Sequence, residues 1–209
     1  MKISYAVTVC NEFFEIKRLL PLLIKSKREE DEIVILYDSK NGTLDVEEYL
    51  RSMSIAYPHH FVWVSKPFEN HFADWKNTLT RLCSGDYIFN IDADEYPNEY
   101  LISNIHDVLE QNPTVDMFIV PRINTVEGIT QEHINKWGWQ INDREWINFP
   151  DYQSRVYRRN GEIMWANKVH ERVINTRSYA YLPDEEYWCL YHPKTIERQE
   201  KQNNYYNTL

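Results

Sequence analysis

The chain has 209 residues, a formal net charge of -9 and a hydrophobic content of 43%, which suits one globular domain with a sizeable core. The acidic balance argues against a nucleic acid as partner, because a phosphate backbone would be repelled. No apolar run approaches the roughly 20 residues that a membrane-spanning helix needs. Three widely spaced cysteines form no metal or disulfide pattern, so we expect a protein of a reducing compartment, the cytoplasm.

The first half of the chain alternates short apolar strands with amphipathic helices. Strands are predicted over 3–10, 32–39, 61–67, 85–95 and 115–122, with helices over 11–27, 43–53, 70–83 and 98–110. Asn11 is the expected N-cap of the first helix, and Pro21 is expected to end or kink it. Such alternation predicts βαβ units, and therefore an α/β fold with a mostly parallel central sheet flanked by helices.

The second half of the chain has a different character. A long polar and aromatic stretch covers 123–150, and 151–167 is predicted to be a β-hairpin with a type I′ turn at Asn160-Gly161. A short strand near 187–191 and a polar C-terminal helix follow. No linker separates the two halves, so we expect a single domain over residues 1–209.

The fourth predicted strand ends in the acids Asp92, Asp94 and Glu95. Ligands of parallel sheets bind at the carboxyl ends of the strands, which is where these acids lie. On an extended backbone Asp92 and Asp94 point the same way, and neighbouring carboxylates favour a hard cation such as Mg²⁺ or Mn²⁺. A solvated acidic turn is the alternative, but the position after a buried run favours a metal site that could hold a diphosphate.

Three segments, VTVCNE, ILYDS and FADWKNTLTRLCSGDYIFNIDADE, together resemble a GT-A glycosyltransferase of family 2. The segment QSRVYRRNGEIMWANKVHERV is similar to the arginine-bearing hairpin and His-Glu motif of one branch of that family. LYHP is similar to a C-terminal histidine motif of many GT-A enzymes. The resemblance covers nearly the whole chain and implies a GT-A fold, with a nucleotide-sugar-binding half over 1–122 and an acceptor and catalytic half over 123–209.

The resemblance implies a donor site in the first half. The residues that it places at the nucleotide are Thr8, Cys10, Glu12, Asp38, Asp74 and Asp92. A hydrogen bond from a uracil N–H to Asp38 would suit a UDP-sugar, although capping of the following turn is an equal alternative for this carboxylate. Arg155 on the predicted hairpin could grip the diphosphate. Lys76 is expected to be a solvated charge.

The resemblance also implies the ligands of a Mn²⁺ or Mg²⁺ ion. Asp94 is the expected direct ligand, whereas Asp92 binds the ion, the ribose or a metal-bound water. Glu95 supports the metal site or the start of the next helix. His192 matches the C-terminal histidine ligand, and His170 could take its place; the sequence does not choose between them.

Sugar transfer with inversion needs a base that takes the proton from the acceptor hydroxyl. The resemblance places this base in the second half, where Glu171 is a carboxylate with no fixed cation expected beside it. A salt bridge from Glu171 to Arg172 or Arg155 is the alternative, and Asp151 is the second candidate for the base.

Four tryptophans crowd the acceptor half, and we expect some of them to form a stacking platform for a sugar acceptor. They are Trp137, Trp139, Trp146 and Trp165.

The function implied is a metal-dependent glycosyltransferase that moves a sugar from a nucleoside-diphosphate sugar, with a UDP-sugar favoured, to a saccharide or other hydroxyl acceptor with inversion. A nucleotidyltransferase is one alternative, but the expected Gly-rich phosphate loop after the first strand is absent. A non-catalytic sugar-binding module is another, and the retained Asp94 and acceptor-side acids argue against it.

Overall fold

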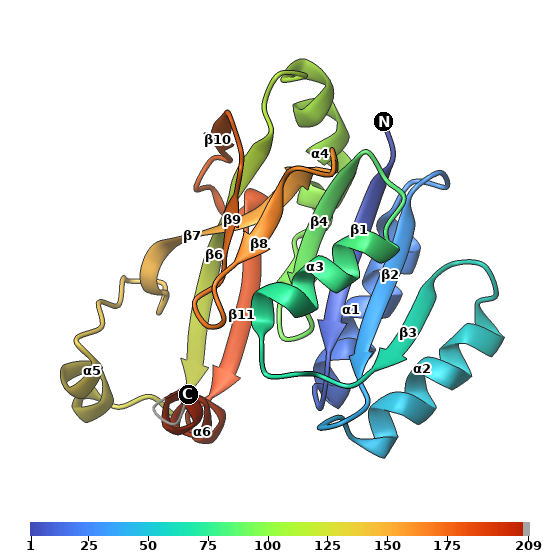
Figure 1. The fold of residues 1–209 in the computed structure, drawn as a ribbon. Helices are drawn as coiled ribbons and strands as arrows, with labels where there is room; N and C mark the ends of the chain where they lie inside the picture. Colours follow the sequence, from blue (N-terminus) through green and yellow to red (C-terminus); the bar gives the residue numbers. More distant parts are fainter. Residues whose placement is uncertain (207–209) are drawn as a thin grey trace.

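Within the described residues, one sheet of nine strands joins both halves of the chain (Figure 1). The computed structural model describes the backbone of residues 1–206 and the side chains of residues 1–203. The parallel group consists of β1 (Ile3–Val9), β2 (Glu32–Asp38), β3 (Val62–Lys66) and β4 (Tyr87–Asp92). The strand order is β3-β2-β1-β4-β7-β6-β11-β5, with β10 also paired to β6.

The second half of the chain continues this sheet beyond β4. Its strands are β6 (Met117–Glu127), β7 (Ile147–Arg158), β10 (Tyr179–Tyr181) and β11 (Leu190–Thr195), while the short β5 (Tyr96–Pro97) pairs with β11 at the edge. β7 runs antiparallel to both β4 and β6, and β6 is parallel to β10 and β11. The prediction of a mostly parallel α/β sheet is confirmed.

The two faces of the sheet carry separate cores because side chains alternate along each strand. The helices are α1 (Phe13–Ser26), α2 (Leu44–Ala56), α3 (Phe72–Leu82), α4 (Glu99–Gln111), α5 (Gln131–Trp137) and α6 (Ile196–Tyr206), with a 3-10 turn, η1, at Glu186–Trp188. Tyr5 and Val7 of β1 pack in a cluster with α1, α2 and α4, whereas Ala6 packs in a cluster with α3 and the smaller sheet. In Figure 1, α3 lies in front of the sheet.

The expected N-cap of the first helix is wrong, and Pro21 does not end the helix. α1 has Glu12, rather than Asn11, at its N-cap position, and the Glu12 carboxylate accepts hydrogen bonds from the backbone N–H groups of Cys10 and Asn11 at 2.7 and 3.1 Å. Pro21 lies inside α1 and does not end it. The apolar side of α1 is buried against the core on both sides of this proline, and such packing outweighs local propensity.

The predicted hairpin over 151–167 is also wrong in its pairing. β7 bonds to β4 and β6, while β8 (Met164–Ala166) pairs with β9 (Arg172–Ile174) in a separate two-stranded sheet. Gly161 has a φ of +83°, but Asn160 does not have a positive φ, so the turn is not type I′. The hairpin of the acceptor half is therefore β8–β9, and residues 167–171 form its tip.

Candidate active site

Asp92 and Asp94 lie at the carboxyl edge of the sheet, as predicted, but they do not share one environment. β4 ends at Asp92, and the chain then turns, with the Ala93 N–H bonded to the Thr8 carbonyl and the Glu95 N–H bonded to the Asp92 carbonyl. Asp94 is therefore on a turn instead of an extended strand. The assumption that the two carboxylates project together is wrong, and each has its own partners.

Asp92 is an anion held between two buried cations. Its Oδ2 lies 2.6 Å from Arg155 Nη2, and its Oδ1 lies 3.2 Å from Lys76 Nζ and 3.4 Å from Thr8 Oγ1. Burial by itself would raise the pKa of Asp92, but Arg155 and then Lys76 outweigh it and hold the pKa far below its usual range. Both oxygens of Asp92 are thus occupied by protein groups in this structure.

A line of alternating charges leads from Arg155 across the sheet. Glu95 is fully buried, and its Oε1 accepts from Arg155 Nη2 at 2.5 Å and from Arg122 Nη1 at 2.7 Å. Arg122 in turn donates to Asp151 Oδ2 from Nε and Nη2, at 2.9 and 2.6 Å. Burial raises the pKa of Asp151, but Arg122 and further donors lower it overall. Such a fully paired carboxylate is a weak base.

Asp94 contacts the C-terminal histidine motif. Asp94 Oδ2 lies 3.2 Å from His192 Nε2, and Lys194 Nζ and Arg198 Nη2 each lie 3.8 Å from the same oxygen. Burial opposes the ionised form, yet His192 and then Lys194 lower the pKa of Asp94 to about 2. Asp94 is therefore an anion at neutral pH.

Asn124 fixes the orientation of the His192 ring and the proton on its Nδ1. The Asn124 side-chain amide donates to Asp151 Oδ2 at 2.8 Å, so its carbonyl oxygen faces His192 Nδ1 at 2.7 Å. A carbonyl oxygen only accepts, and Nδ1 must carry the proton. Nε2, the other ring nitrogen, faces Asp94 Oδ2 at 3.2 Å; with a proton it donates to this carboxylate, and without one it offers a lone pair to a metal ion. An imidazole nitrogen and a carboxylate oxygen that face each other form a donor set suited to Mn²⁺ or Zn²⁺.

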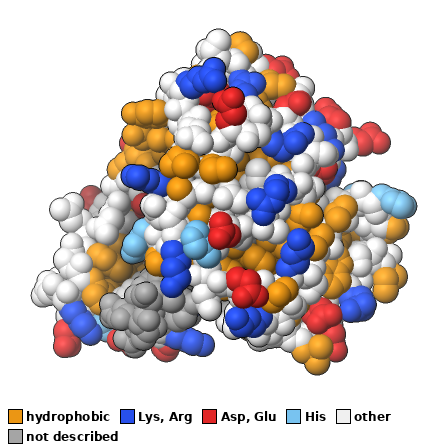
Figure 2. Space-filling model, viewed as in Figure 1, with side chains coloured by type: hydrophobic (Ala, Val, Ile, Leu, Met, Phe, Trp, Pro, Cys, Tyr) orange, Lys and Arg blue, Asp and Glu red, His pale blue; other side chains and the backbone are white. Residues whose placement is uncertain are grey.

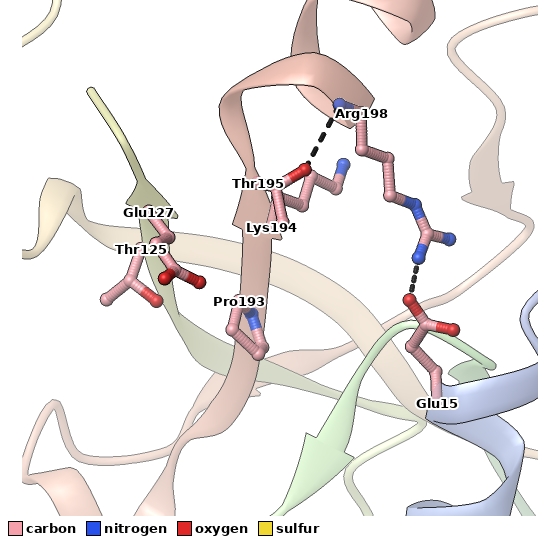
Figure 3. A pocket seen from close by; sticks show the side chains of 7 residues that line it. All are labelled: Glu15, Thr125, Glu127, Pro193, Lys194, Thr195 and Arg198. Carbon is pink, nitrogen blue, oxygen red and sulfur yellow. Dashed lines mark hydrogen bonds and ion pairs between the residues drawn. The ribbon is translucent and has the colours of Figure 1, made fainter. Parts of the chain in front are cut away.

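A cavity of about 330 Å³ lies beside this pair, at the ends of β6 and β11 (Figure 3). Its lining consists of Glu15, Thr125, Glu127, Pro193, Lys194, Thr195 and Arg198. Arg198 of α6 reaches from the cavity wall to Glu15, and it lies 3.5 Å from Glu12 Oε1. Charged groups of both signs therefore meet here, and Figure 2 shows acidic, basic and histidine side chains interspersed over the face that carries α3.

The predicted donor residues of the first two strands lie together at their carboxyl ends. Cys10 Sγ is 3.8 Å from Asp38 Oδ2, and burial raises the pKa of the Cys10 thiol to about 12. Burial also raises the pKa of Glu12. Asp38 Oδ1 accepts from the backbone N–H groups of Lys40, Asn41 and Phe68, so its carboxylate caps the turn after β2. Asp74 is exposed at the start of α3, with its carboxylate 3.3 Å from His71.

The surroundings of Glu171 differ from expectation. Glu171 lies at the tip of the β8–β9 hairpin, and its Oε1 is 2.9 Å from Lys76 Nζ. The expected absence of a fixed cation beside Glu171 is wrong, and so is the expectation that Lys76 is solvated, because Lys76 is only 4% exposed. The buried positions of α3 are Ala73, Lys76 and Leu79. They are three residues apart, which places them on one side of the helix.

The remaining predicted residues divide between surface and core. His170 is exposed beside Glu171 at the hairpin tip. Over the part of the chain that the structure describes, no three His, Cys, Asp or Glu side chains converge as a metal site, so His170 does not join Asp94 and His192.

Trp165 is buried and donates to the Tyr157 hydroxyl at 3.0 Å, which removes it from any stacking platform. Trp137 and Trp139 are half-buried, with ring centroids 4.6 Å apart.

Residues 4–188 match the sequence profile of glycosyl transferase family 2. The chain belongs to this family. The fold of this family 2 member is similar to that of S. aureus TarS 1–349, with a TM-score of 0.63 and 15% identity over 92% of this chain and 60% of that one. A TarS structure in complex with UDP-GlcNAc matches with a TM-score of 0.61, 16% identity, and coverage of 93% and 59%.

A third solved structure covers less of the chain. The mannosyltransferase PcManGT from Pyrobaculum calidifontis, solved with GDP-Man and Mn²⁺, matches with a TM-score of 0.50 and 22% identity over 57% of this chain and 35% of that one. A comparison with curated protein sequences finds no match. The chain spans about 60% of the length of the TarS 1–349 structures. In residues 1–206, none of the helices is long and apolar enough to cross a membrane.

Several residues at the candidate site of this family 2 member were not predicted from the sequence. They are Lys76, Arg122, Asn124, Lys194 and Arg198. Lys194 follows His192 at the strand period of two, so its place on the same side of β11 could have been read from the sequence. Arg122 and Asn124 were hidden because the pairing of β6 with β7 and β11 is long-range.

Proposed function

We propose that this glycosyltransferase is metal-dependent and moves a sugar, with inversion, from a nucleoside-diphosphate sugar to a hydroxyl of a saccharide or similar acceptor. The observation that carries the proposal is the pairing of Asp94 with Nε2 of His192 at the carboxyl edge of the sheet. The complexes of TarS with UDP and UDP-GlcNAc support a UDP-sugar as donor. We also keep the division into a donor half, 1–122, and an acceptor half, 123–209, within one domain.

The donor is proposed to lie across the ends of β1, β2 and β4. Thr8, Cys10 and Glu12 would line the ribose and base, and Asp38 would face the base from the turn after β2. Asp74 is a further proposed contact at the start of α3. Arg155 is proposed to act on the donor through Asp92, since its guanidinium is buried against Asp92 and Glu95.

Asp94 and His192 would hold a Mn²⁺ or Mg²⁺ ion. When bound, such an ion neutralises charge on the diphosphate and on the departing nucleoside diphosphate. Asn124 holds the His192 ring by Nδ1, so that Nε2 stays directed at this place and would bind the ion after losing its proton. Asp92, whose oxygens contact Lys76 and Arg155, is better suited to a ribose hydroxyl or a metal-bound water than to direct ligation.

Glu171 is the proposed base. Its Oε1 is held by Lys76 Nζ at 2.9 Å. Oε2 would accept the proton of the acceptor hydroxyl as that oxygen attacks the anomeric carbon. The bond from this carbon to the diphosphate breaks on the opposite face, and the nucleoside diphosphate carries away the electron pair. Asp151 is the weaker candidate because four donors already bind its carboxylate.

A donor screen tests the proposed function. UDP-, GDP- and dTDP-sugars are incubated with the protein, with and without Mn²⁺, and release of the nucleoside diphosphate is measured. We expect Mn²⁺-dependent release from at least one UDP-sugar. Turnover that does not depend on a metal ion, or no turnover with any donor, would remove the proposed mechanism. A cytoplasmic location also stays a prediction; the three free thiols are in keeping with it.

A further inference from the structure

Lys76 is buried in the protein interior, where lysines are rarely found. Its side chain is only 5% exposed, on the inner side of α3. An ammonium group removed from water is costly unless charged partners surround it. Lys76 Nζ has two such partners, Asp92 Oδ1 at 3.2 Å and Glu171 Oε1 at 2.9 Å, and it lies 4.5 Å above the Trp165 ring. These three contacts fix the ammonium in one position.

The two carboxylates that share Lys76 belong to different halves of the chain. Asp92 ends β4 in the proposed donor half, and Glu171 lies at the hairpin tip in the proposed acceptor half. Asp92 also has Arg155, whereas the only cation that contacts Glu171 within the described residues is Lys76. Loss of the Lys76 charge would therefore leave Asp92 with one cation but Glu171 with none.

The neighbouring residues of α3 hold the same hairpin by its backbone. The Asn77 side chain accepts from the Trp165 N–H and donates to the Trp165 carbonyl, both at 2.8 Å. The Phe72 N–H donates to the Lys168 carbonyl at 3.0 Å. The backbone of β8 and of the hairpin tip is thus fixed on α3, and the Lys76 ammonium is left to fix the Glu171 side chain.

We propose that Lys76 is a positioning residue that holds Oε1 of Glu171 and thereby directs Oε2 at the acceptor hydroxyl, from a site fixed to the donor through Asp92. This inference rests on the proposed role of Glu171 as base. A base held by a helix of the donor half keeps a constant place relative to the donor. Displacement of a catalytic group by about 1 Å can lower a rate about 100-fold, so such a hold matters.

The test is a double-mutant cycle on the full chain. Lys76→Met and Glu171→Gln are measured alone and together, with Lys76→Arg as the conservative variant and Lys168→Met, an exposed lysine of the same tip, as matched control. The readouts are the kcat of UDP release from the UDP-sugar that is turned over in the donor screen with Mn²⁺, and the Kd of UDP from calorimetry. Hydrogen exchange of residues 167–171 reports on the hairpin tip without any turnover.

We expect Lys76→Met to lower kcat about 100-fold and to change the Kd of UDP by less than about fivefold, since Asp92 keeps Arg155. In the Glu171→Gln background it should lower kcat no further, because a residue that acts through Glu171 has nothing left to position. Lys76→Arg should recover part of kcat, and Lys168→Met should match the parent protein. Amide hydrogen exchange of residues 167–171 should be faster in Lys76→Met than in the parent protein. In Lys168→Met it should be unchanged.

Two outcomes would overturn the inference while the proposed function stands. One is that Lys76→Met lowers kcat in the Glu171→Gln background by a factor similar to that in the parent background. The other is unchanged exchange at the hairpin tip in Lys76→Met. Absence of turnover in the parent protein with every donor would instead remove the proposed function, and the role of Lys76 with it. If Lys76→Met does not fold, Lys76→Gln, which cannot bind both carboxylates as an ion pair, takes its place in the cycle.

Discussion

Replacement of Arg155 by methionine is expected to destabilise the protein strongly, because this guanidinium contacts the buried carboxylate of Glu95 and the half-buried carboxylate of Asp92. Arg155 is 3% exposed and lies 2.6 Å from Asp92 and 2.5 Å from Glu95. After the change, Lys76 is the one cationic partner left to Asp92 among the described residues, and Arg122 the one left to Glu95. Removal of one member of a buried ion pair typically costs about 3–5 kcal/mol.

This free energy corresponds to a large shift of the melting temperature. Each kcal/mol lowers Tm by about 2–4 °C in a domain of this size, so a decrease of about 6–20 °C is expected. Arg177→Met is the matched control, since Arg177 is 81% exposed and its pair with Glu162 lies at the surface. Exposed pairs contribute about 0–1 kcal/mol, and the control should lose at most a few degrees.

Urea unfolding and calorimetry measure both variants beside the parent protein. Equal and small losses of stability in Arg155→Met and Arg177→Met would refute the reasoning, because they would mean that Asp92 and Glu95 do not need the buried cation. A normal Tm combined with a lost affinity for UDP would instead favour a direct contact between Arg155 and the diphosphate.

Three further predictions concern single acids. Asp94→Ala should abolish Mn²⁺-dependent binding of UDP, measured by calorimetry, while Tm changes little; Mn²⁺-dependent binding that persists would identify the wrong ligand. Glu171→Gln should leave the Kd of UDP unchanged and lower the rate of sugar transfer about 10²–10⁴-fold, and unchanged transfer would eliminate it as the base. For Glu32, burial opposes ionisation, but Lys2, Ser4 and Ser84 lower the pKa to about 2. The ionised form is favoured in the folded state, so its stabilisation is complete above the ordinary pKa and is lost as pH falls toward 2. The stability gap between the parent protein and Glu32→Gln should therefore shrink between pH 5 and pH 2, and a constant gap would contradict this.

The sequence predicted the parallel part of the sheet well because its signals are local. The strands around Val7, Ile35 and Phe89 are short apolar runs, and the helices between them carry apolar residues at helical spacing. Asp92 and Asp94 could be placed at the sheet edge for the same reason. The direction of each carboxylate could not, since the turn at Ala93 sends Asp94 to His192 and leaves Asp92 with Lys76 and Arg155.

The parts that sequence reasoning missed depend on partners far away in the chain. β6 continues through Asn124 to Glu127 because β11 pairs with it there. Asn124 and His192, which meet in this pairing, are 68 residues apart in the sequence. β8 pairs with β9 because β7 is already paired on both sides. The burial of Lys76 was not predicted because a lysine is normally exposed to solvent. Its ammonium can be buried here because Glu171, which is far away in the sequence, lies beside it together with Asp92.

The antiparallel β7 between β4 and β6 has a consequence for biosynthesis. As the polypeptide leaves the ribosome, the whole β1–β4 group is complete before β7 exists, so β4 then presents an open edge to the solvent. Arg155 arrives on that same strand, which means that Asp92 and Glu95 gain this counterion only as the edge is closed. Until β7 is in place, the open edge of β4 is therefore a place where another strand can pair.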